Sequence, residues 1–247
     1  MFPLNTAMLA RYAPVRTPVF LVLPVVPTEA VVMESPDCIV FIVDDDRRVR
    51  GALGELFSAM GVRFATFESA AEYLDFQRPD VPACLILDVR LPGLSGLEVQ
   101  AQIADTCHPP IVFISGHGDV PSCVRALKAG AVDFLTKPFS ERALIDAVQS
   151  AIARDTKERT SRAELTVLRE RHRLLTPRER EVLPLVVSGL PNKLAAAELG
   201  ISAVTLQIHR SKVMRKMAAE SLADLVRIAA LLGVPLFRPR SYEKAHA

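Results

Sequence analysis

Four groups of polar side chains in the first half of the chain each follow a short apolar run. They are Asp44-Asp45-Asp46 after 39–43, Asp88 after 84–87, Ser115 after 111–114 and Lys137 after 133–136. Short β-rich runs followed by turn residues are typical of buried parallel strands, and open α/β sheets bind ligands beyond the carboxyl ends of their strands. We therefore expect the acids, the hydroxyl and the amine to meet at one end of a sheet. Such a set could hold a divalent cation beside a carboxylate that accepts a phosphoryl group.

Short β-rich runs alternate with helical stretches across this half of the chain. The predicted strands are 39–43, 63–67, 84–87, 111–115 and 133–135, separated by amphipathic segments such as 49–60. This alternation predicts right-handed βαβ units and a parallel sheet covered by helices on both faces. Five strands fit the flavodoxin-like winding.

The charge of the chain is unevenly distributed. Its 247 residues suggest two modest domains, and the net charge is only +2. Residues 35–150 carry 10 basic and 16 acidic side chains, whereas residues 174–247 carry 11 basic and 6 acidic ones. This asymmetry favours a metal-binding or signalling module joined to a module that binds a polyanion. Unevenly distributed surface charge without a function is the alternative.

The first residues and the cysteines bear on where the protein works. Residues 1–35 are interrupted by prolines, and the apolar run 19–23 is too short to span a bilayer. We expect this segment to be a disordered extension or a mis-assigned start, with Met33 as the physiological start, rather than a secretory signal. The four cysteines are far apart and form no CxxC motif, which indicates reduced thiols in a cytoplasmic protein without membrane association.

The second half of the chain is predicted to be helical. Ser140 is a plausible N-cap for a helix that presents Leu144, Val148 and Ile152 on one face. Residues 154–173 have mixed charge and few apolar side chains, which predicts a helical or semi-flexible linker.

A cluster of four short helices is expected after the linker. Thr176-Pro177-Arg178-Glu179 is a capping box with proline at the first helical position, and Pro184 predicts a kink or a strained turn. Further helices are expected at about 192–199, 202–217 and 221–233, with a turn at Gly200. A short helix, a glycine turn and a longer capped helix are typical of a helix-turn-helix.

The segment 36–153 resembles the receiver domain of bacterial two-component response regulators. The matching residues are Asp44-Asp45, Asp88, Ser115 and Lys137-Pro138-Phe139, and the stretch 115–134 is similar to the FixJ-like subfamily. The resemblance implies that Asp88 accepts a phosphoryl group from a sensor histidine kinase as an acyl phosphate. It also implies that the Lys137-Pro138 peptide bond is cis.

The resemblance further implies a magnesium site and a switch. Mg²⁺ would bind Asp45, Asp88 and the backbone carbonyl of Arg90, with Asp44 holding a metal-bound water. Lys137 and Ser115 would bind the phosphate, and Phe134 would rotate in response. Asp46 is expected only to cap a helix or to be solvated.

The segment 174–236 resembles the LuxR-type DNA-binding domain, followed by a tail at 237–247. The resemblance rests on 175–183, Asn192-Lys193, Ile201-Ser202, Thr205-Leu206, His209-Arg210 and Lys216-Met217. On the third helix, Leu206, Val213 and Met217 are expected to face the core, with His209 packed and hydrogen-bonded between them. The opposite face is expected to enter the major groove of double-stranded DNA and consists of Gln207, Ile208, Arg210, Ser211, Lys212 and Arg215.

Individual DNA contacts follow from side-chain chemistry. Gln207 could contact adenine and Ile208 a thymine methyl. Contacts with phosphates, which orient the domain without specifying sequence, are expected from Asn192, Lys193, Arg210, Lys212 and Arg215. Many relatives have lysine where this chain has Gln207 and Ser211, so the resemblance does not fix its operator sequence, and we expect weaker non-specific binding to DNA.

Together these features predict a transcription factor controlled by phosphorylation of Asp88. Phosphorylation is expected to promote homodimerisation and DNA binding, with activation of transcription favoured and RNA polymerase as a further partner. The protein would not be an enzyme beyond its own phosphoryl uptake and loss. A phospho-aspartyl hydrolase is disfavoured because the second acid it needs is replaced by Arg90. An orphan receiver that binds DNA without phosphorylation, or serves as a scaffold, is the remaining alternative.

Overall fold

The structure is a computed structural model that describes residues 38–116 and 120–237. The expectations for residues 1–35, and for the tail beyond Phe237, lie outside the described residues. Within the described ranges, none of the helices combines the length and apolar character that crossing a bilayer requires.

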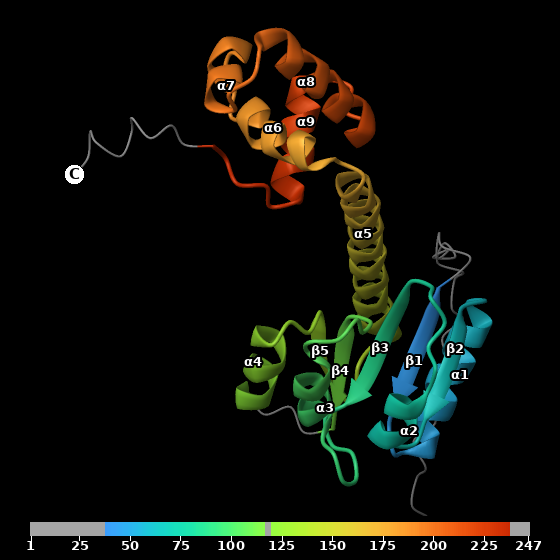
Figure 1. Cartoon of the computed structure of the whole chain (residues 1–247). Coiled ribbons are helices and arrows are strands. Elements are labelled where there is room, and N and C mark those ends of the chain that lie inside the picture. The colour runs from blue at the N-terminus through green and yellow to red at the C-terminus, as the bar shows by residue number, and fades with distance from the viewer. Residues whose placement is uncertain (1–37, 117–119, 238–247) are drawn as a thin grey trace, which may run out of the picture. The chain divides into compact units, whose positions relative to one another are not determined.

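A five-stranded parallel sheet forms the centre of the first domain, as predicted (Figure 1). The strands are β1 Ile39–Val43, β2 Arg63–Phe67, β3 Ala83–Asp88, β4 Ile111–Ser115 and β5 Asp133–Thr136, in the order β2-β1-β3-β4-β5. Every residue of β1, β3 and β4 is buried. These three strands lie between others and are covered on both faces, which explains why their sequences are apolar up to the last residue of β3 and β4.

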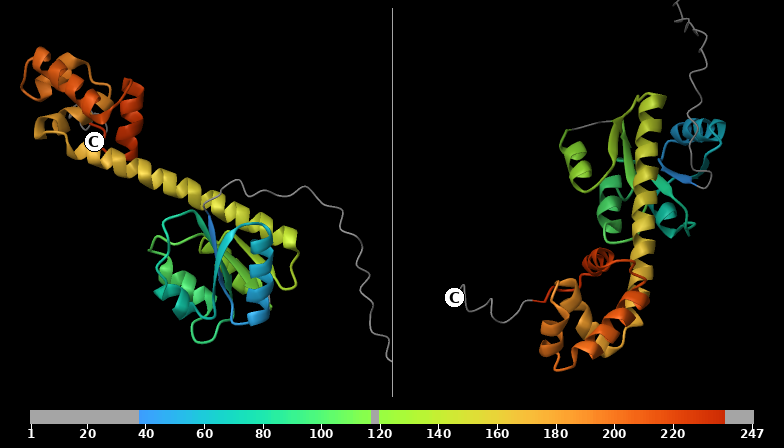
Figure 2. Two further views of the ribbon diagram at one scale, coloured as in Figure 1. Left: turned by 90° about the vertical axis from the view of Figure 1, so that its right-hand side faces the viewer. Right: turned by 90° about the horizontal axis from the view of Figure 1, so that it is seen from above.

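Helices cover the two faces of the sheet in separate layers. They are α1 Arg47–Ala59, α2 Ala70–Asp75, α3 Gly96–Ile103, α4 Val120–Lys128 and α5 Glu141–Arg173. Tyr73, Val99 and Ala126 from α2, α3 and α4 join the core on one face. Phe57 from α1 and Leu144 from α5 join the core on the other. Figure 2 shows the two layers from further sides.

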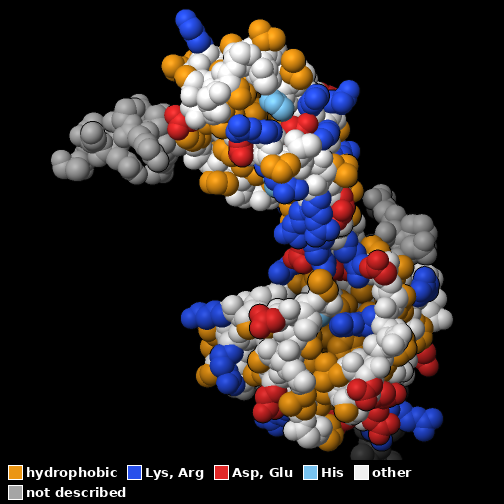
Figure 3. All heavy atoms as spheres, viewed as in Figure 1, with side chains coloured by type: hydrophobic (Ala, Val, Ile, Leu, Met, Phe, Trp, Pro, Cys, Tyr) orange, Lys and Arg blue, Asp and Glu red, His pale blue; other side chains and the backbone are white. Residues whose placement is uncertain are grey.

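The α5 helix runs without interruption for 33 residues. Ser140 caps it, as predicted, by accepting a hydrogen bond from the backbone N–H of Ala143. Its first half contributes Val148 and Ile152 to the core of the sheet domain, and Leu168 belongs to the core of the C-terminal helices. The mixed-charge segment after Arg154 is therefore helical. Figure 3 shows Lys and Arg side chains gathered over it.

Four helices form the C-terminal domain: α6 Pro177–Val187, α7 Asn192–Glu198, α8 Ala203–Met217 and α9 Leu222–Leu231. The predicted capping box is present, with Thr176 and Glu179 bonded to each other's backbone N–H. The α6 helix continues through Pro184 to Val187. Gly200 forms the turn between α7 and α8 with a φ of +65°, a conformation that glycine adopts without a steric penalty.

Candidate functional site

The carboxyl ends of β1 and β3 bring three aspartates together. Asp44 follows β1 and is fully buried, Asp45 is exposed, and Asp88 ends β3 with 6% of its surface accessible. One carboxylate oxygen from each aspartate lies within 4.8 Å of one from each of the other two. The sheet register places β1 beside β3 along its whole length. Acidic side chains that are far apart in the sequence therefore lie close together in the fold.

Lys137 connects this cluster to the end of β5. Its Nζ lies 2.6 Å from Asp44 Oδ2 and 2.6 Å from Asp88 Oδ2. The Lys137 backbone N–H donates to the carbonyl of Ser115 at 2.8 Å, and the Lys137-Pro138 peptide bond is cis, as the resemblance implied. The amine is thus held against two carboxylates.

The charges of this cluster do not balance. Burial raises the pKa of Asp44, and the hydrogen bond from Lys137 offsets only part of that effect. Burial lowers the pKa of Lys137, but its hydrogen bonds to Asp44 and Asp88 outweigh burial and raise that pKa overall. Two carboxylates share the Lys137 ammonium, which favours its charged form. One ammonium beside three carboxylates leaves negative charge that a cation could neutralise.

The remaining predicted residues lie around the cluster. Ser115 is fully buried at the end of β4, and the exposed Arg90 donates its backbone N–H to Asp88 Oδ1 at 2.8 Å. Phe134 on β5 is half-buried, with its ring centroid 6.2 Å from that of Phe113. Asp46 caps α1 by accepting from the backbone N–H of Arg48, as expected.

Gly96 at the start of α3 lies against the backbone of Asp88. A Cβ at this position would lie 2.3 Å from the Asp88 carbonyl oxygen and 3.1 Å from the Phe113 ring. Sequence reasoning missed this role because nothing local marks Gly96 as different from other loop glycines. Only the return of the chain to β3 creates the close approach.

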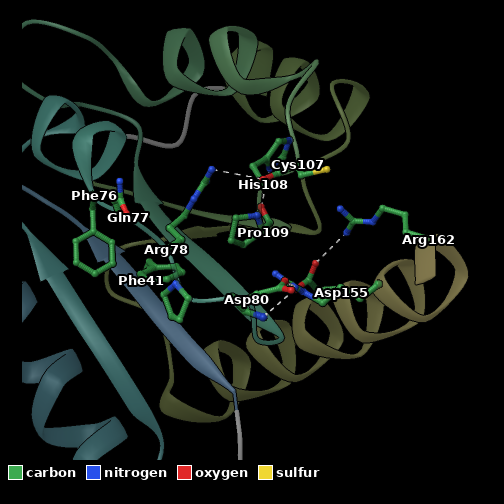
Figure 4. A pocket seen from close by; sticks show the side chains of 13 residues that line it. Phe41, Phe76, Gln77, Arg78, Asp80, Cys107, His108, Pro109, Asp155 and Arg162 are labelled. Atoms are coloured by element: carbon green, nitrogen blue, oxygen red, sulfur yellow. Dashed lines mark hydrogen bonds and ion pairs between the residues drawn. The ribbon is translucent and has the colours of Figure 1, made fainter. Parts of the chain in front are cut away.

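A second charged cluster, also missed, lies at the opposite end of β3 (Figure 4). The Asp155 carboxylate on α5 is buried and accepts from the Ala83 backbone N–H at 2.9 Å and from Arg159 Nε at 2.7 Å. Arg162 approaches the same carboxylate at 3.7 Å, and Arg159 also pairs with Asp80. These groups line a pocket of about 510 Å³. Because their charges are paired within the cluster, we assign it a structural role that anchors α5.

The α8 side chains that were predicted to face the core are buried in the structure. Leu206, Val213 and Met217 are fully buried in the C-terminal core. His209 is half-buried, but its Nδ1 atom is buried without a hydrogen-bond partner, so the expected hydrogen bond is missing at that atom.

The outward side of α8 is accessible. Exposed side chains there are Gln207, Ile208, Ser211, Lys212 and Arg215, whereas Arg210 is half-buried. Lys193 on α7 is exposed and Asn192 half-buried. Asn192 Nδ2 donates to Gln207 Oε1 at 2.6 Å, and an Arg210 N–H donates to Asn192 Oδ1 at 3.0 Å.

Comparisons with known proteins agree with both halves of this description. Residues 40–149 match the response regulator receiver domain, and residues 173–229 match the luxR family of bacterial regulatory proteins. The chain is 50% identical to Nodulation protein W of Bradyrhizobium diazoefficiens over 201 residues, 81% of this chain and 88% of that protein. It is 42% identical to the transcriptional regulatory protein FixJ of Azorhizobium caulinodans, over 79% of this chain and 93% of that one. A solved structure of the response regulator StyR matches with a TM-score of 0.70 and 44% identity, covering 78% of this chain and 98% of that one.

Proposed function

The chain belongs to the response regulators that join a receiver domain to a LuxR-type DNA-binding domain, and we propose from this premise that Asp88 is its phosphoacceptor. The observation that carries the proposal is the position of Lys137 Nζ, 2.6 Å from both the Asp44 and the Asp88 carboxylates. We further propose that residues 36–153 form the receiver, 154–173 the linker and 174–236 the DNA-binding domain.

Asp88 would act as a nucleophile toward the phosphohistidine of a sensor kinase. A carboxylate oxygen of Asp88 attacks phosphorus, the P–O bond forms as the P–N bond to histidine breaks, and an acyl phosphate results. The Arg90 backbone N–H, 2.8 Å from Asp88 Oδ1, orients the carboxylate. Lys137 and the Ser115 hydroxyl would then bind the phosphate oxygens. This uptake, and the later loss of the phosphoryl group, is the only chemistry we assign to the protein.

The aspartate cluster suits Mg²⁺, a hard cation that prefers oxygen ligands. We assign Asp45, Asp88 and the backbone carbonyl of Arg90 as ligands, with Asp44 acting through a water. One carboxylate oxygen from each of Asp44, Asp45 and Asp88 lies within 4.8 Å of the others, a spacing that fits a single ion. When bound, the ion supplies positive charge beside the transferring phosphoryl group.

Phosphorylation would change the partners of Lys137 and so the surface near β5. A phosphate on Asp88 competes with Asp44 for the ammonium. Phe134 lies on β5 and is half-buried, and its side chain would rotate as its neighbours shift. The surface formed by α4, β5 and α5 would be remodelled, which would favour homodimerisation.

The DNA-binding domain would place α8 in the major groove of double-stranded DNA. Support comes from the accessible side of α8, where Gln207, Ile208 and Ser211 are exposed beside basic residues. Asn192, Lys193, Arg210, Lys212 and Arg215 would hold phosphates. A dimer would bind two half-sites and regulate transcription, with activation through RNA polymerase favoured, in the cytoplasm where the DNA is.

Labelling with acetyl phosphate and magnesium tests the phosphoacceptor. Wild-type protein should take up label, and Asp88→Asn should take up none. Asp133→Asn is the matched control, because Asp133 is a half-buried carboxylate at the opposite end of β5 from Lys137 and should leave labelling unchanged. Label in the Asp88→Asn protein would refute the assignment. A gel shift with and without beryllofluoride and magnesium then separates phosphorylation-controlled DNA binding from an orphan receiver, which would bind equally in both.

A further inference from the structure

Three side chains on the outward surface of the C-terminal domain form one hydrogen-bonded chain. Arg210 donates to Asn192 Oδ1 at 3.0 Å, and Asn192 Nδ2 donates to Gln207 Oε1 at 2.6 Å. Gln207 and Arg210 are three residues apart on α8 and so share a face. Asn192 is the first residue of α7. The network therefore joins the first helix of the helix-turn-helix to the second.

The direction of this chain is set by chemistry. A guanidinium has only donors, so the Asn192 atom that faces Arg210 must be the carbonyl oxygen. The other end of the Asn192 amide is then a donor. Gln207 must meet that donor with its own carbonyl oxygen. Donor and acceptor chemistry therefore fixes both amide orientations, which atomic positions alone do not distinguish.

The consequence concerns what Gln207 offers to DNA. Its Oε1 is turned toward Asn192, so its amide nitrogen, with two N–H groups, is the end left for a partner. A glutamine free to use both ends pairs with adenine, which presents the N7 acceptor beside the N6 donor. Guanine presents two adjacent acceptors, N7 and O6, and suits a group that offers only donors.

We propose that Asn192 is a specificity-determining residue that orients Gln207 to select guanine rather than adenine. The inference rests on the proposed placement of α8 in the major groove. It revises the expectation that Gln207 contacts adenine. It also gives Asn192 a positioning role in addition to any contact with phosphate.

Two substitutions invert the hydrogen-bonding pattern without removing it. Asn192→Asp keeps an acceptor for Arg210 but cannot donate, so Gln207 must turn its N–H toward residue 192 and its oxygen toward the groove. An acid at the first position of a helix also suits the helix dipole. Gln207→Glu, at an exposed position, has the same effect because a carboxylate accepts from Asn192 and presents its other oxygen to the base. Both should favour a base with a major-groove donor, cytosine N4 or adenine N6.

The test is a binding selection from a randomised half-site library, using the full chain with beryllofluoride and magnesium, followed by sequencing. At one position the wild type should prefer guanine over adenine on the order of ten-fold, and Gln207→Ala should abolish that preference. Asn192→Asp and Gln207→Glu should both shift it toward cytosine or adenine. Lys193→Ala is the matched control and should weaken binding to all sequences alike.

The outcomes separate this inference from the proposed function. If Gln207→Ala changes one position but the wild type prefers adenine there, or both inverting variants keep guanine, the inference is wrong and the groove-reading role stands. If Gln207→Ala changes no position, Gln207 does not contact bases and the inference is also wrong. If the wild type selects no sequence, the proposed function itself is refuted. Thermal melting by circular dichroism checks that each variant is folded.

Discussion

Replacing Asp155 with alanine should destabilise the receiver domain far more than replacing its exposed neighbour Glu158 on the same helix. Asp155 anchors α5, the helix that continues into the C-terminal core, to the start of β3. Its side chain is 1% exposed and accepts from Ala83 N–H at 2.9 Å and Arg159 Nε at 2.7 Å. The Glu158 side chain is 46% exposed and pairs with Arg154 at 2.9 Å.

The magnitude follows from what each substitution leaves behind. Asp155→Ala removes the acceptor of the buried Ala83 N–H, which costs about 1–3 kcal/mol. It also leaves Arg159 without its buried partner, and breaking a buried ion pair costs about 3–5 kcal/mol in total. Arg159 is 29% exposed and keeps Asp80 as a partner, so we expect a loss of about 3 kcal/mol, near the lower end. Glu158→Ala removes an exposed helical ion pair, for which about 0.3–0.5 kcal/mol is expected.

Urea unfolding of the full chain, followed by circular dichroism, measures the difference in the free energy of unfolding. Hydrogen exchange of the Ala83 amide reports the broken contact directly and should accelerate only in Asp155→Ala. Asp155→Asn keeps an acceptor for the Ala83 N–H, so its free energy of unfolding should lie between those of the wild type and Asp155→Ala. Equal losses in Asp155→Ala and Glu158→Ala, with unchanged exchange at Ala83, would refute the anchoring role.

Two further predictions concern backbone space and pH. Gly96→Ala should sharply reduce acetyl phosphate labelling, because its Cβ would lie 2.3 Å from the Asp88 carbonyl oxygen. Gly51→Ala, in open space on α1, should leave labelling intact and raise stability by about 1 kcal/mol. Normal labelling of Gly96→Ala would contradict this. Burial alone would raise the pKa of Glu179, but hydrogen bonds from Lys216 and the Thr176 backbone lower it overall, below its ordinary value of 4.5. A carboxyl group whose pKa is lowered by folding stabilises the folded protein fully above its unfolded pKa, here about 4.5. That stabilisation is lost as the pH falls through the pKa of the folded state. The difference in melting temperature between wild type and Glu179→Gln should therefore be constant above that pH and shrink below it; a difference that persists to pH 3 would rule out this coupling.

The sequence by itself determined the elements and their order. The five strands were visible as short β-rich runs, and the helix starts at Ser140 and Thr176 as capping residues, because these signals depend on neighbours a few residues apart. The polar residues that follow these runs supplied the candidate site, and parallel strands made their approach predictable, because the carboxyl ends of such strands lie at one end of a sheet. The resemblance supplied the role of each residue.

Tertiary structure decided which groups are partners. Lys137 reaches Asp44 across 93 positions of the chain, and Asp155 reaches Ala83 across 72. No local pattern marks Asp155 as buried, Gly96 as adjacent to the Asp88 carbonyl, or Asn192 as bonded to Gln207. Each depends on the packing of two separate elements, and that packing minimises the free energy of the whole domain rather than of any short segment.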